Sequence, residues 1–265
     1  MNIVYKGLPV HYSVCGDGYP LIFLHGFNEN LTIWDSIVPQ LSSSYTCILI
    51  DLPGFGQSAL PVNLTIKYMA NAIYRIIQEL SLLKPILIGH SMGGYVTLEL
   101  VTLYPETFSG AALFHSTAYE DSEEKKNNRF KTLEFLNKNP LELFFKVFTE
   151  SLVAPFNRNS TMLRMMDTIV NQTPKASVIA GIKCMIERKD NSDVLKNSNI
   201  PWLFITGKYD ELLLIEQISL QASYCKLAMF DILQHSAHLG MIEEPTRSSE
   251  IIQNFGDWVQ WIYKK

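Results

Sequence analysis

The sequence has few of the features that mark metal-binding, disulfide-stapled or membrane-spanning proteins. Its four cysteines lie far apart and form no C-x-x-C pair or His/Cys cluster, so no metal site is expected. It contains no run of about 18 uncharged apolar residues, which argues against a membrane-spanning helix. The first residues lack the charged and apolar regions of a signal peptide, and a cytoplasmic location is therefore predicted.

Positive charge is also scarce. Lysine and arginine number 22 against 26 acidic residues, which gives a net charge of −4. The basic residues are scattered, whereas a nucleic-acid partner requires a concentrated positive field, so none is expected. Hydrophobic residues make up 47% of the 265 positions, enough for a large core without staples. The length allows one large domain or two small ones.

The first third of the chain alternates short apolar runs with helical periodicity. Near-continuous apolar runs are typical of strands that are buried on both faces. This alternation predicts an α/β protein with a parallel sheet that is covered by helices on both sides. Strands are expected at 21–24, 47–50, 85–88 and 111–114, and helices at about 32–41, 65–80 and 93–104, after an antiparallel N-terminal hairpin that ends at Cys15.

A purely helical pattern replaces this alternation over residues 117–189. The polar run at 120–128 is predicted to be a solvated, mobile entry loop, and apolar residues at helical spacing follow it. Strands are again expected at 202–206 and 226–230, before a closing amphipathic helix at 250–262. We therefore expect one sheet domain, residues 1–116 and 190–265, with residues 117–189 inserted as a helical cap.

The strongest chemical signal is the segment Gly-His-Ser-Met-Gly-Gly at 89–94. It follows a predicted strand and opens a predicted helix, the context in which G-x-S-x-G forms a nucleophile elbow. The glycines two residues before and two residues after Ser91 permit the sharp turn that exposes its hydroxyl. The backbone N–H of Met92 lies at the helix N-terminus and can donate to a developing oxyanion.

A serine hydroxyl needs a histidine to accept its proton and a carboxylate to orient that histidine. His238 follows the last predicted strand, late in the chain as the order Ser, acid, His requires, and His235 is a weaker alternative base. Asp210 comes directly after the strand at 202–206, at the same sheet edge as the elbow. Glu211 is the alternative acid, and Asp231 is interpreted as structural.

The loop after the first parallel strand can complete such a site. The backbone N–H of Phe27 is predicted to be the second oxyanion donor. His25 is a candidate substrate contact, although a role in holding the loop by hydrogen bonds is favoured, and His115 is interpreted as an ordinary hydrogen-bonded histidine. The glycine-rich turn at 51–58 lacks the G-K-[ST] of a phosphate-binding loop and is interpreted as a scaffold for the rim of the site.

Together these segments resemble the α/β-hydrolase superfamily, in particular its small capped members. The similar segments are 25–27, 51–58, 89–94, 207–210 and 238–245. The resemblance implies a mostly parallel eight-stranded sheet, a helical lid, and no metal or organic cofactor. It also implies that Ser91 is the nucleophile, His238 the base and Asp210 the orienting acid, with Phe27 and Met92 as oxyanion donors.

Departures from particular subfamilies narrow the expected activity. Epoxide hydrolases and haloalkane dehalogenases have aspartate in place of Ser91, and the Gly-Pro-Gly of proline iminopeptidases and the three-glycine loop of hormone-sensitive-lipase-like esterases are absent. The chain is most similar to carboxylesterases such as the pimeloyl-carrier-protein methyl esterases, to thioesterases and to cofactor-free perhydrolases.

The sequence thus predicts a serine hydrolase that cleaves a small to medium, largely apolar ester or thioester. In the cap, Phe144 and Phe148 are candidate substrate contacts, although packing between cap helices is the favoured explanation for any single one of these residues. A ligand-sensing or signalling protein that keeps the same residues with little turnover is the alternative, because fold alone does not fix function. Monomer and homodimer both remain open.

Overall fold

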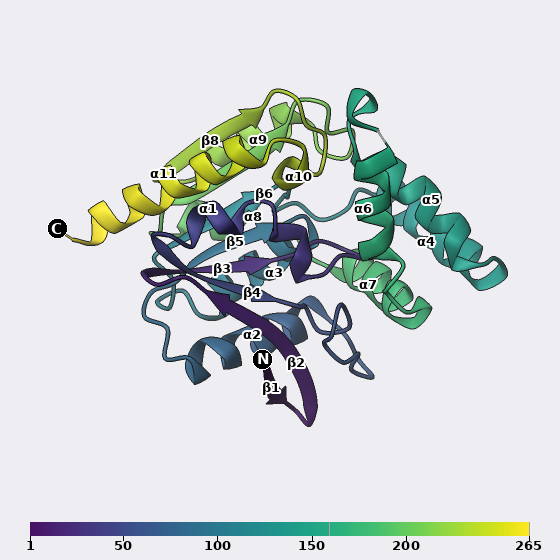
Figure 1. The fold of residues 1–265 in the computed structure, drawn as a ribbon, viewed down its shortest axis with the longest axis horizontal. Coiled ribbons are helices and arrows are strands. Elements are labelled where there is room, and N and C mark those ends of the chain that lie inside the picture. The colour runs from purple at the N-terminus through teal and green to yellow at the C-terminus, as the bar shows by residue number, and fades with distance from the viewer. Residues whose placement is uncertain (159, 265) are drawn as a thin grey trace.

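The computed structural model describes residues 1–158 and 160–264, and its centre is an eight-stranded sheet (Figure 1). The strands are β1 (Asn2–Tyr5), β2 (Leu8–Cys15), β3 (Tyr19–Leu24), β4 (Tyr45–Ile50), β5 (Ile86–His90), β6 (Gly110–Phe114), β7 (Trp202–Gly207) and β8 (Ala228–Leu233). Their spatial order is β1-β2-β4-β3-β5-β6-β7-β8. β3 lies between β4, which follows it in sequence, and β5, from which the later strands continue in order. The loop after β3 therefore lies near the middle of the sheet edge.

The pairing confirms the predicted mostly parallel sheet. β1 pairs antiparallel with β2, and β2 antiparallel with β4, whereas every pair from β4 to β8 is parallel. The apolar runs of β3, β5, β6 and β7 are buried almost throughout, as expected of strands with helices on both faces. The carboxyl ends of the parallel strands consequently meet at one edge.

Helices cover both faces of this sheet. One layer contains α2 (Ile66–Glu79), α3 (Met92–Leu103), α8 (Ser192–Asn197) and α9 (Ile215–Ala222). The other contains α1 (Val38–Leu41), α10 (Gly240–Glu243) and the long α11 (Pro245–Tyr263). In the described part of the chain, no helix has both the length and the apolar character needed to cross a bilayer.

Helices α4–α8 are inserted between β6 and β7. The cap helices α4 (Glu123–Lys138), α5 (Leu141–Leu152), α6 (Ser160–Val170) and α7 (Lys175–Glu187), with the short 3₁₀ helix η2 (Pro155–Asn157), lie together beyond one end of the sheet (Figure 1). A helical insertion is therefore confirmed. Its domain boundaries at 117 and 189 stay a prediction.

The entry to the cap differs from the sequence-based expectation. Residues 120–128, predicted to be a solvated mobile loop, contain the start of α4, whose N-terminus is capped by the Ser122 hydroxyl. Asp121 is buried and forms ion pairs with Arg129 and with Arg188 of the segment after α7. The loop prediction was wrong because one of these partners, Arg188, is distant in sequence, and the two ion pairs together anchor the start of a helix within the polar run.

Three smaller differences concern element boundaries. The helix expected at 32–41 is split into the 3₁₀ helix η1 (Leu31–Trp34) and α1, because Pro39 has no N–H with which to continue a helix through this point. The last strand begins at Ala228 rather than 226, and the closing helix begins at Pro245 rather than 250. None of these differences moves the sheet edge.

Removing the Asp121 carboxylate should destabilise the fold. The Asp121→Ala variant leaves the buried Arg188 guanidinium without its carboxylate partner, and we expect its free energy of unfolding to fall by about 3 kcal/mol in urea denaturation. Glu120→Ala is the matched control, because Glu120 is half exposed and pairs only with Lys126 at the surface, so its loss should cost about 0–1 kcal/mol. Equal losses in both variants would contradict an anchoring role for Asp121.

Candidate active site

Ser91 lies on the sharp turn between β5 and α3. Its backbone has φ 48° and ψ −112°, a strained conformation for a residue with a side chain. A Cβ at Gly89 would collide with the Thr97 hydroxyl, and one at Gly93 would collide with the Leu24 carbonyl oxygen. Glycine is therefore required at both positions, as a sharp turn at Ser91 demands.

Three side chains from separate loops form a continuous hydrogen-bonded row. His238 Nε2 lies 2.9 Å from Ser91 Oγ, and His238 Nδ1 lies 2.8 Å from Asp210 Oδ2. The other carboxylate oxygen, Oδ1, accepts hydrogen bonds from the backbone N–H groups of Leu212 and Leu213. Because Nδ1 faces a carboxylate, it carries the proton, which leaves Nε2 free to accept the serine hydroxyl.

Burial and charge together set the protonation of this pair. Burial by itself would raise the pKa of Asp210, but the facing charge of His238 and the hydrogen bonds from two imidazoles outweigh it and hold that pKa well below its usual range. For His238, burial lowers the pKa, and the attraction of Asp210 more than compensates, so its pKa is raised above 6.5.

The alternative base and acids lie elsewhere. His235 is exposed, and its backbone N–H donates to Glu244. Asp231 pairs with Arg247, as its structural interpretation implied. Glu211 is exposed at the mouth of the cavity beside Ser91 and makes no contact with His238. The geometry therefore favours His238 and Asp210 over these candidates.

A second histidine binds Asp210. His115 directly follows β6 and is fully buried, and its Nδ1 lies 3.2 Å from Asp210 Oδ2. Its Nε2 accepts the backbone N–H of Gly240, so the ring proton is on Nδ1 and is donated to the carboxylate. Burial lowers the pKa of His115 to about 4, which keeps it neutral. The interpretation of His115 as an ordinary histidine missed this contact. Its position directly after a parallel strand was the available signal.

Glu29 and His90 form another buried connection. The Glu29 carboxylate accepts the backbone N–H of Gly26 and lies 3.0 Å from His90 Nδ1. The His90 Nε2 proton is donated to the backbone carbonyl of His238. Burial alone would raise the pKa of Glu29, but the interaction with the facing His90 outweighs it, so the net shift of this pKa is downward. The loops after β3, β5 and β8 are thereby tied together.

The loop that carries His238 is also bonded to the cap. The backbone N–H of His238 donates to the carbonyl of Leu152, at the end of α5. Glu243 accepts the backbone N–H of Ala237 with one carboxylate oxygen and that of Ala154 with the other. One acidic side chain therefore fixes the loop and the end of α5 against each other.

The predicted oxyanion donors lie in the right loops. Phe27 lines the cavity beside Ser91, and Met92 is the first residue of α3. Neither backbone N–H has an acceptor among residues 1–158 and 160–264, so both are available as donors. Their assignment as an oxyanion hole stays a prediction.

Of the three candidate substrate contacts, only Phe148 lines the cavity at Ser91. His25 as a substrate contact was wrong: its ring is fully buried, and its Nε2 accepts the backbone N–H of Leu52, which fits the favoured interpretation that it holds the loop. Phe144 is stacked on Phe148 with ring centroids 5.3 Å apart and lines a neighbouring groove in the cap.

The cavity beside Ser91 has a volume of about 470 Å³ and two different walls. One wall is apolar and is formed by Phe27, Phe148, Leu152, Met185 and Leu213. Another part of the wall carries charged side chains at the start of α4 and after α7, namely Asp121, Glu124, Lys125, Arg129 and Arg188. The sequence led us to expect a largely apolar cavity, and only the apolar part of the wall matches this expectation.

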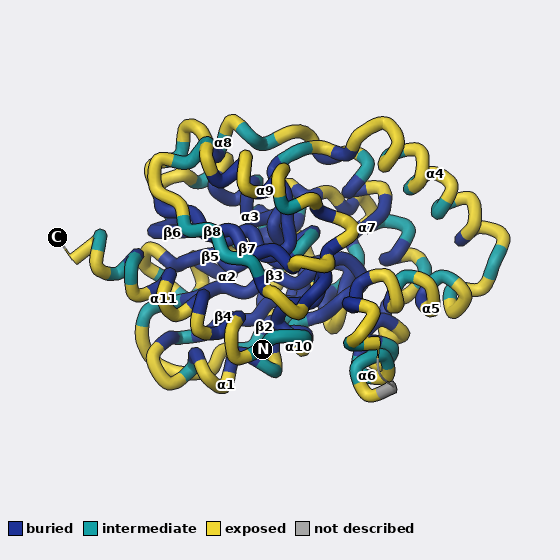
Figure 2. Tube along the Cα trace, turned by 90° about the horizontal axis from the view of Figure 1, so that it is seen from above, coloured by how far each residue is buried: buried dark blue, intermediate teal, exposed yellow. Residues whose placement is uncertain are grey.

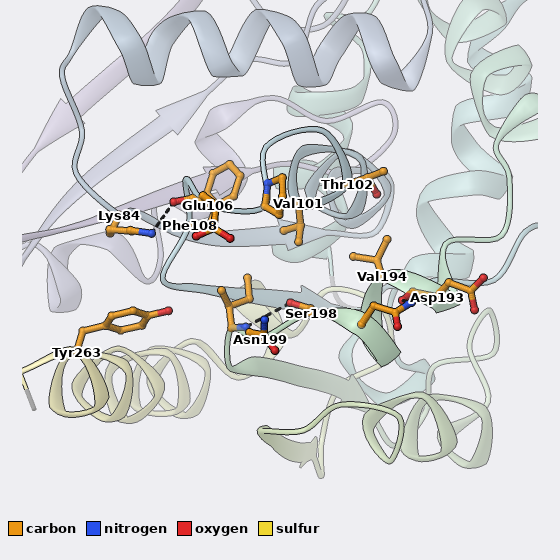
Figure 3. A pocket seen from close by; sticks show the side chains of 13 residues that line it. Lys84, Val101, Thr102, Glu106, Phe108, Asp193, Val194, Ser198, Asn199 and Tyr263 are labelled. Atoms are coloured by element: carbon orange, nitrogen blue, oxygen red, sulfur yellow. Dashed lines mark hydrogen bonds between the residues drawn. The ribbon is translucent and has the colours of Figure 1, made fainter.

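Another hollow lies at the opposite edge of the sheet, before the N-terminal ends of β5, β6 and β7 (Figure 3). Its volume is about 420 Å³, and Lys84 at its rim donates to the backbone carbonyl of Glu106. The side chains that line it include no histidine or cysteine. It therefore offers no nucleophile paired with a base.

His115, Asp210 and His238 are close enough to be considered as metal ligands. However, both imidazoles present a protonated Nδ1 to the carboxylate, and coordination would require the lone pairs of those same nitrogens. The arrangement suits a proton-transfer site better than a metal centre.

The contact between His115 and Asp210 can be tested by substitution. His115→Leu leaves the Gly240 N–H unpaired and removes one donor from Asp210, so the free energy of unfolding should fall by about 1–3 kcal/mol. Asp210 then acts more fully on His238, whose pKa should rise in an NMR titration. His115→Asn retains a donor near Asp210 and should show a smaller rise.

His11→Leu serves as the control for this substitution, since the His11 imidazole pairs with Asn2 near the surface and its backbone hydrogen bonds do not depend on the side chain. Its free energy of unfolding should stay within about 0.5 kcal/mol of the wild-type value. Wild-type stability and an unchanged His238 pKa in His115→Leu would show that the second imidazole contributes nothing to the site.

Comparison with known proteins agrees with this geometry. The family model described as alpha/beta hydrolase fold matches residues 19–245. A pimeloyl-[acyl-carrier protein] methyl ester esterase of Aeromonas hydrophila is 28% identical over 253 residues, covering 91% of this chain and 96% of the relative. The corresponding esterase of Wigglesworthia glossinidia brevipalpis is 27% identical over 260 residues, covering 93% and 97%.

Solved structures show the same similarity. A thermophilic esterase from Thermogutta terrifontis superposes with a TM-score of 0.90 at 25% identity, covering 97% of both chains. The enol-lactonase from Burkholderia xenovorans LB400 superposes with a TM-score of 0.88 at 18% identity, covering 96% and 99%, and this likeness shows the fold alone. The chain therefore belongs to the α/β-hydrolase fold family and is an esterase-like member of it.

Proposed function

We propose that this protein is a serine hydrolase that cleaves a carboxylic ester or thioester through an acyl-enzyme on Ser91. The observation that carries this proposal is the row Ser91–His238–Asp210, with successive distances of 2.9 and 2.8 Å, at the wall of a substrate-sized cavity. Its relatives of known activity act on esters, which supports the same bond type here.

In the first half-reaction, His238 Nε2 accepts the hydroxyl proton as Ser91 Oγ attacks the carbonyl carbon. The carbonyl oxygen becomes negatively charged and accepts hydrogen bonds from the N–H groups of Phe27 and Met92. The tetrahedral species then collapses, and the bond from the carbonyl carbon to the leaving oxygen or sulfur breaks. The His238 proton goes to the leaving alcohol or thiol.

Water completes the second half-reaction. His238 takes a proton from water, whose oxygen attacks the acyl carbon, and the same two N–H groups stabilise the second oxyanion. The bond to Ser91 Oγ breaks as His238 returns the proton to that oxygen. Asp210 remains ionised throughout, because its four donors stabilise the charged carboxylate.

Ser91→Ala should abolish hydrolysis of p-nitrophenyl acetate and butyrate, with kcat lowered by about 10⁴ to 10⁶. Ser223→Ala is the control, because Ser223 is an exposed serine directly after α9, and its activity should equal that of the wild type. A fluorophosphonate probe should label the wild type at Ser91 and leave Ser91→Ala unlabelled.

Two outcomes of this experiment argue against the proposal. Equal rates for the wild type and Ser91→Ala would mean that Ser91 is not the nucleophile. Labelling at Ser91 without turnover of any ester or thioester would favour the ligand-sensing alternative. Turnover only in the presence of hydrogen peroxide, with peracid as product, would indicate a perhydrolase.

The pH dependence follows from His238. Asp210 raises the pKa of this imidazole above 6.5, and protonated His238 cannot accept the serine proton. kcat/KM should therefore be full at high pH and should fall as the pH decreases through a single ionisation whose midpoint lies above 6.5. Asp210→Asn removes the negative charge, so its acidic limb should move to lower pH. A wild-type midpoint below 6 would contradict this assignment.

A further inference from the structure

The outer surface of the cap carries an apolar groove between α4 and α5. Its volume is about 550 Å³, and it is lined by Lys131, Thr132, Phe135, Leu143, Phe144, Val147, Phe148 and Ser151. Val147 and Leu143 are 71% and 53% exposed. Figure 2 shows exposed segments along both helices on the outer side of the cap. These large side chains are left facing solvent although they would gain from being covered.

The groove lies next to the cavity at Ser91. Thr132, Phe148 and Ser151 line both hollows, so they form the boundary between them. The Phe148 ring stacks on Phe144, which lines the groove, and meets the edge of Phe27, which lines the cavity, at centroid distances of 5.3 and 5.6 Å. Three aromatic rings therefore lie in series from the Ser91 loop to the cap surface, and Phe148 stands between the two hollows.

The charged part of the cavity wall is unfavourable for a hydrocarbon chain. Asp121, Arg129 and Arg188 form a network of ion pairs that lines the cavity. Covering these charged groups with a hydrocarbon chain would remove water from them without replacing its hydrogen bonds. The Phe148 side is the apolar alternative for a chain longer than the cavity.

We propose that the groove between α4 and α5 binds the hydrocarbon chain of a long-chain ester while the ester group lies at Ser91. This inference rests on the proposed function and narrows its substrate class to esters with linear chains of about eight carbons or more. The chain leaves the cavity past Phe148 and covers Leu143, Val147 and Phe135. The polar remainder of the substrate stays beside the charged wall.

A chain is favoured over a protein partner by the size of the groove. Eight residues line it, whereas a specific protein–protein interface involves about 20–30 residues on each side. A linear hydrocarbon needs no hydrogen-bond partners, and the lining offers mainly carbon atoms. Each methylene that enters the groove should raise kcat/KM about fourfold.

The test compares p-nitrophenyl butyrate with p-nitrophenyl decanoate, both below their critical micelle concentrations. We expect the wild type to prefer decanoate in kcat/KM. Val147→Asp places a charge in the groove at a position that is 71% exposed, so the fold should tolerate it. The decanoate-to-butyrate ratio should fall at least tenfold in this variant. Leu220→Asp on α9, at an equally apolar exposed position outside the groove, should leave the ratio unchanged.

The outcomes separate this inference from the proposed function. If the wild type hydrolyses butyrate through Ser91 but does not prefer decanoate, or if Val147→Asp leaves the ratio unchanged, the groove does not bind the chain and the esterase proposal survives. If no ester is hydrolysed and Ser91 is not labelled, the proposed function itself fails. Conversion of a dimer to a monomer by Val147→Asp, measured by analytical ultracentrifugation, would assign the groove to a second copy and overturn the inference.

Discussion

The geometry of the site depends on one buried carboxylate. Asp210 is almost completely removed from water, and four N–H groups replace the lost hydration: two from the backbone of the following turn and two from imidazole rings. A carboxylate with fewer donors would be costly at this depth. With all four, its negative charge persists, and the orientation of His238 toward Ser91 follows from it.

A second buried, hydrogen-bonded carboxylate lies on the other side of His238. Glu29 is also buried, and it accepts a backbone N–H and faces His90, whose second nitrogen binds the backbone of His238. His238 is thus fixed at its side chain by one carboxylate and at its main chain by a chain of contacts from another. Side chains held in this way lose little freedom when a reaction begins, which is how preorganised sites act.

Local patterns in the sequence were sufficient to predict the sheet, the turn at Ser91 and the candidate residues Ser91, Asp210 and His238. Buried strands require continuous apolar runs, and the turn at Ser91 requires glycine, so both constraints are visible in adjacent residues. The contacts of His115, Glu29 and Asp121 were missed because each depends on a partner in a distant segment that only folding brings close. For His25 the sequence left a loop-holding role and a substrate contact open, because sequence shows which loop holds a side chain but not which way the ring points.

The hydrogen bond from the His238 backbone N–H to the Leu152 carbonyl attaches the end of α5 in the cap to the loop that carries His238. Because the end of α5 is attached to the main chain of His238, a displacement of that end would shift the imidazole relative to Ser91. Glu243 stiffens this connection, since it bonds Ala237 of the His238 loop and Ala154 just after α5. The end of α5 is therefore a fixed part of the cavity wall, and the position of the cap over Ser91 is set by the same bonds that hold His238.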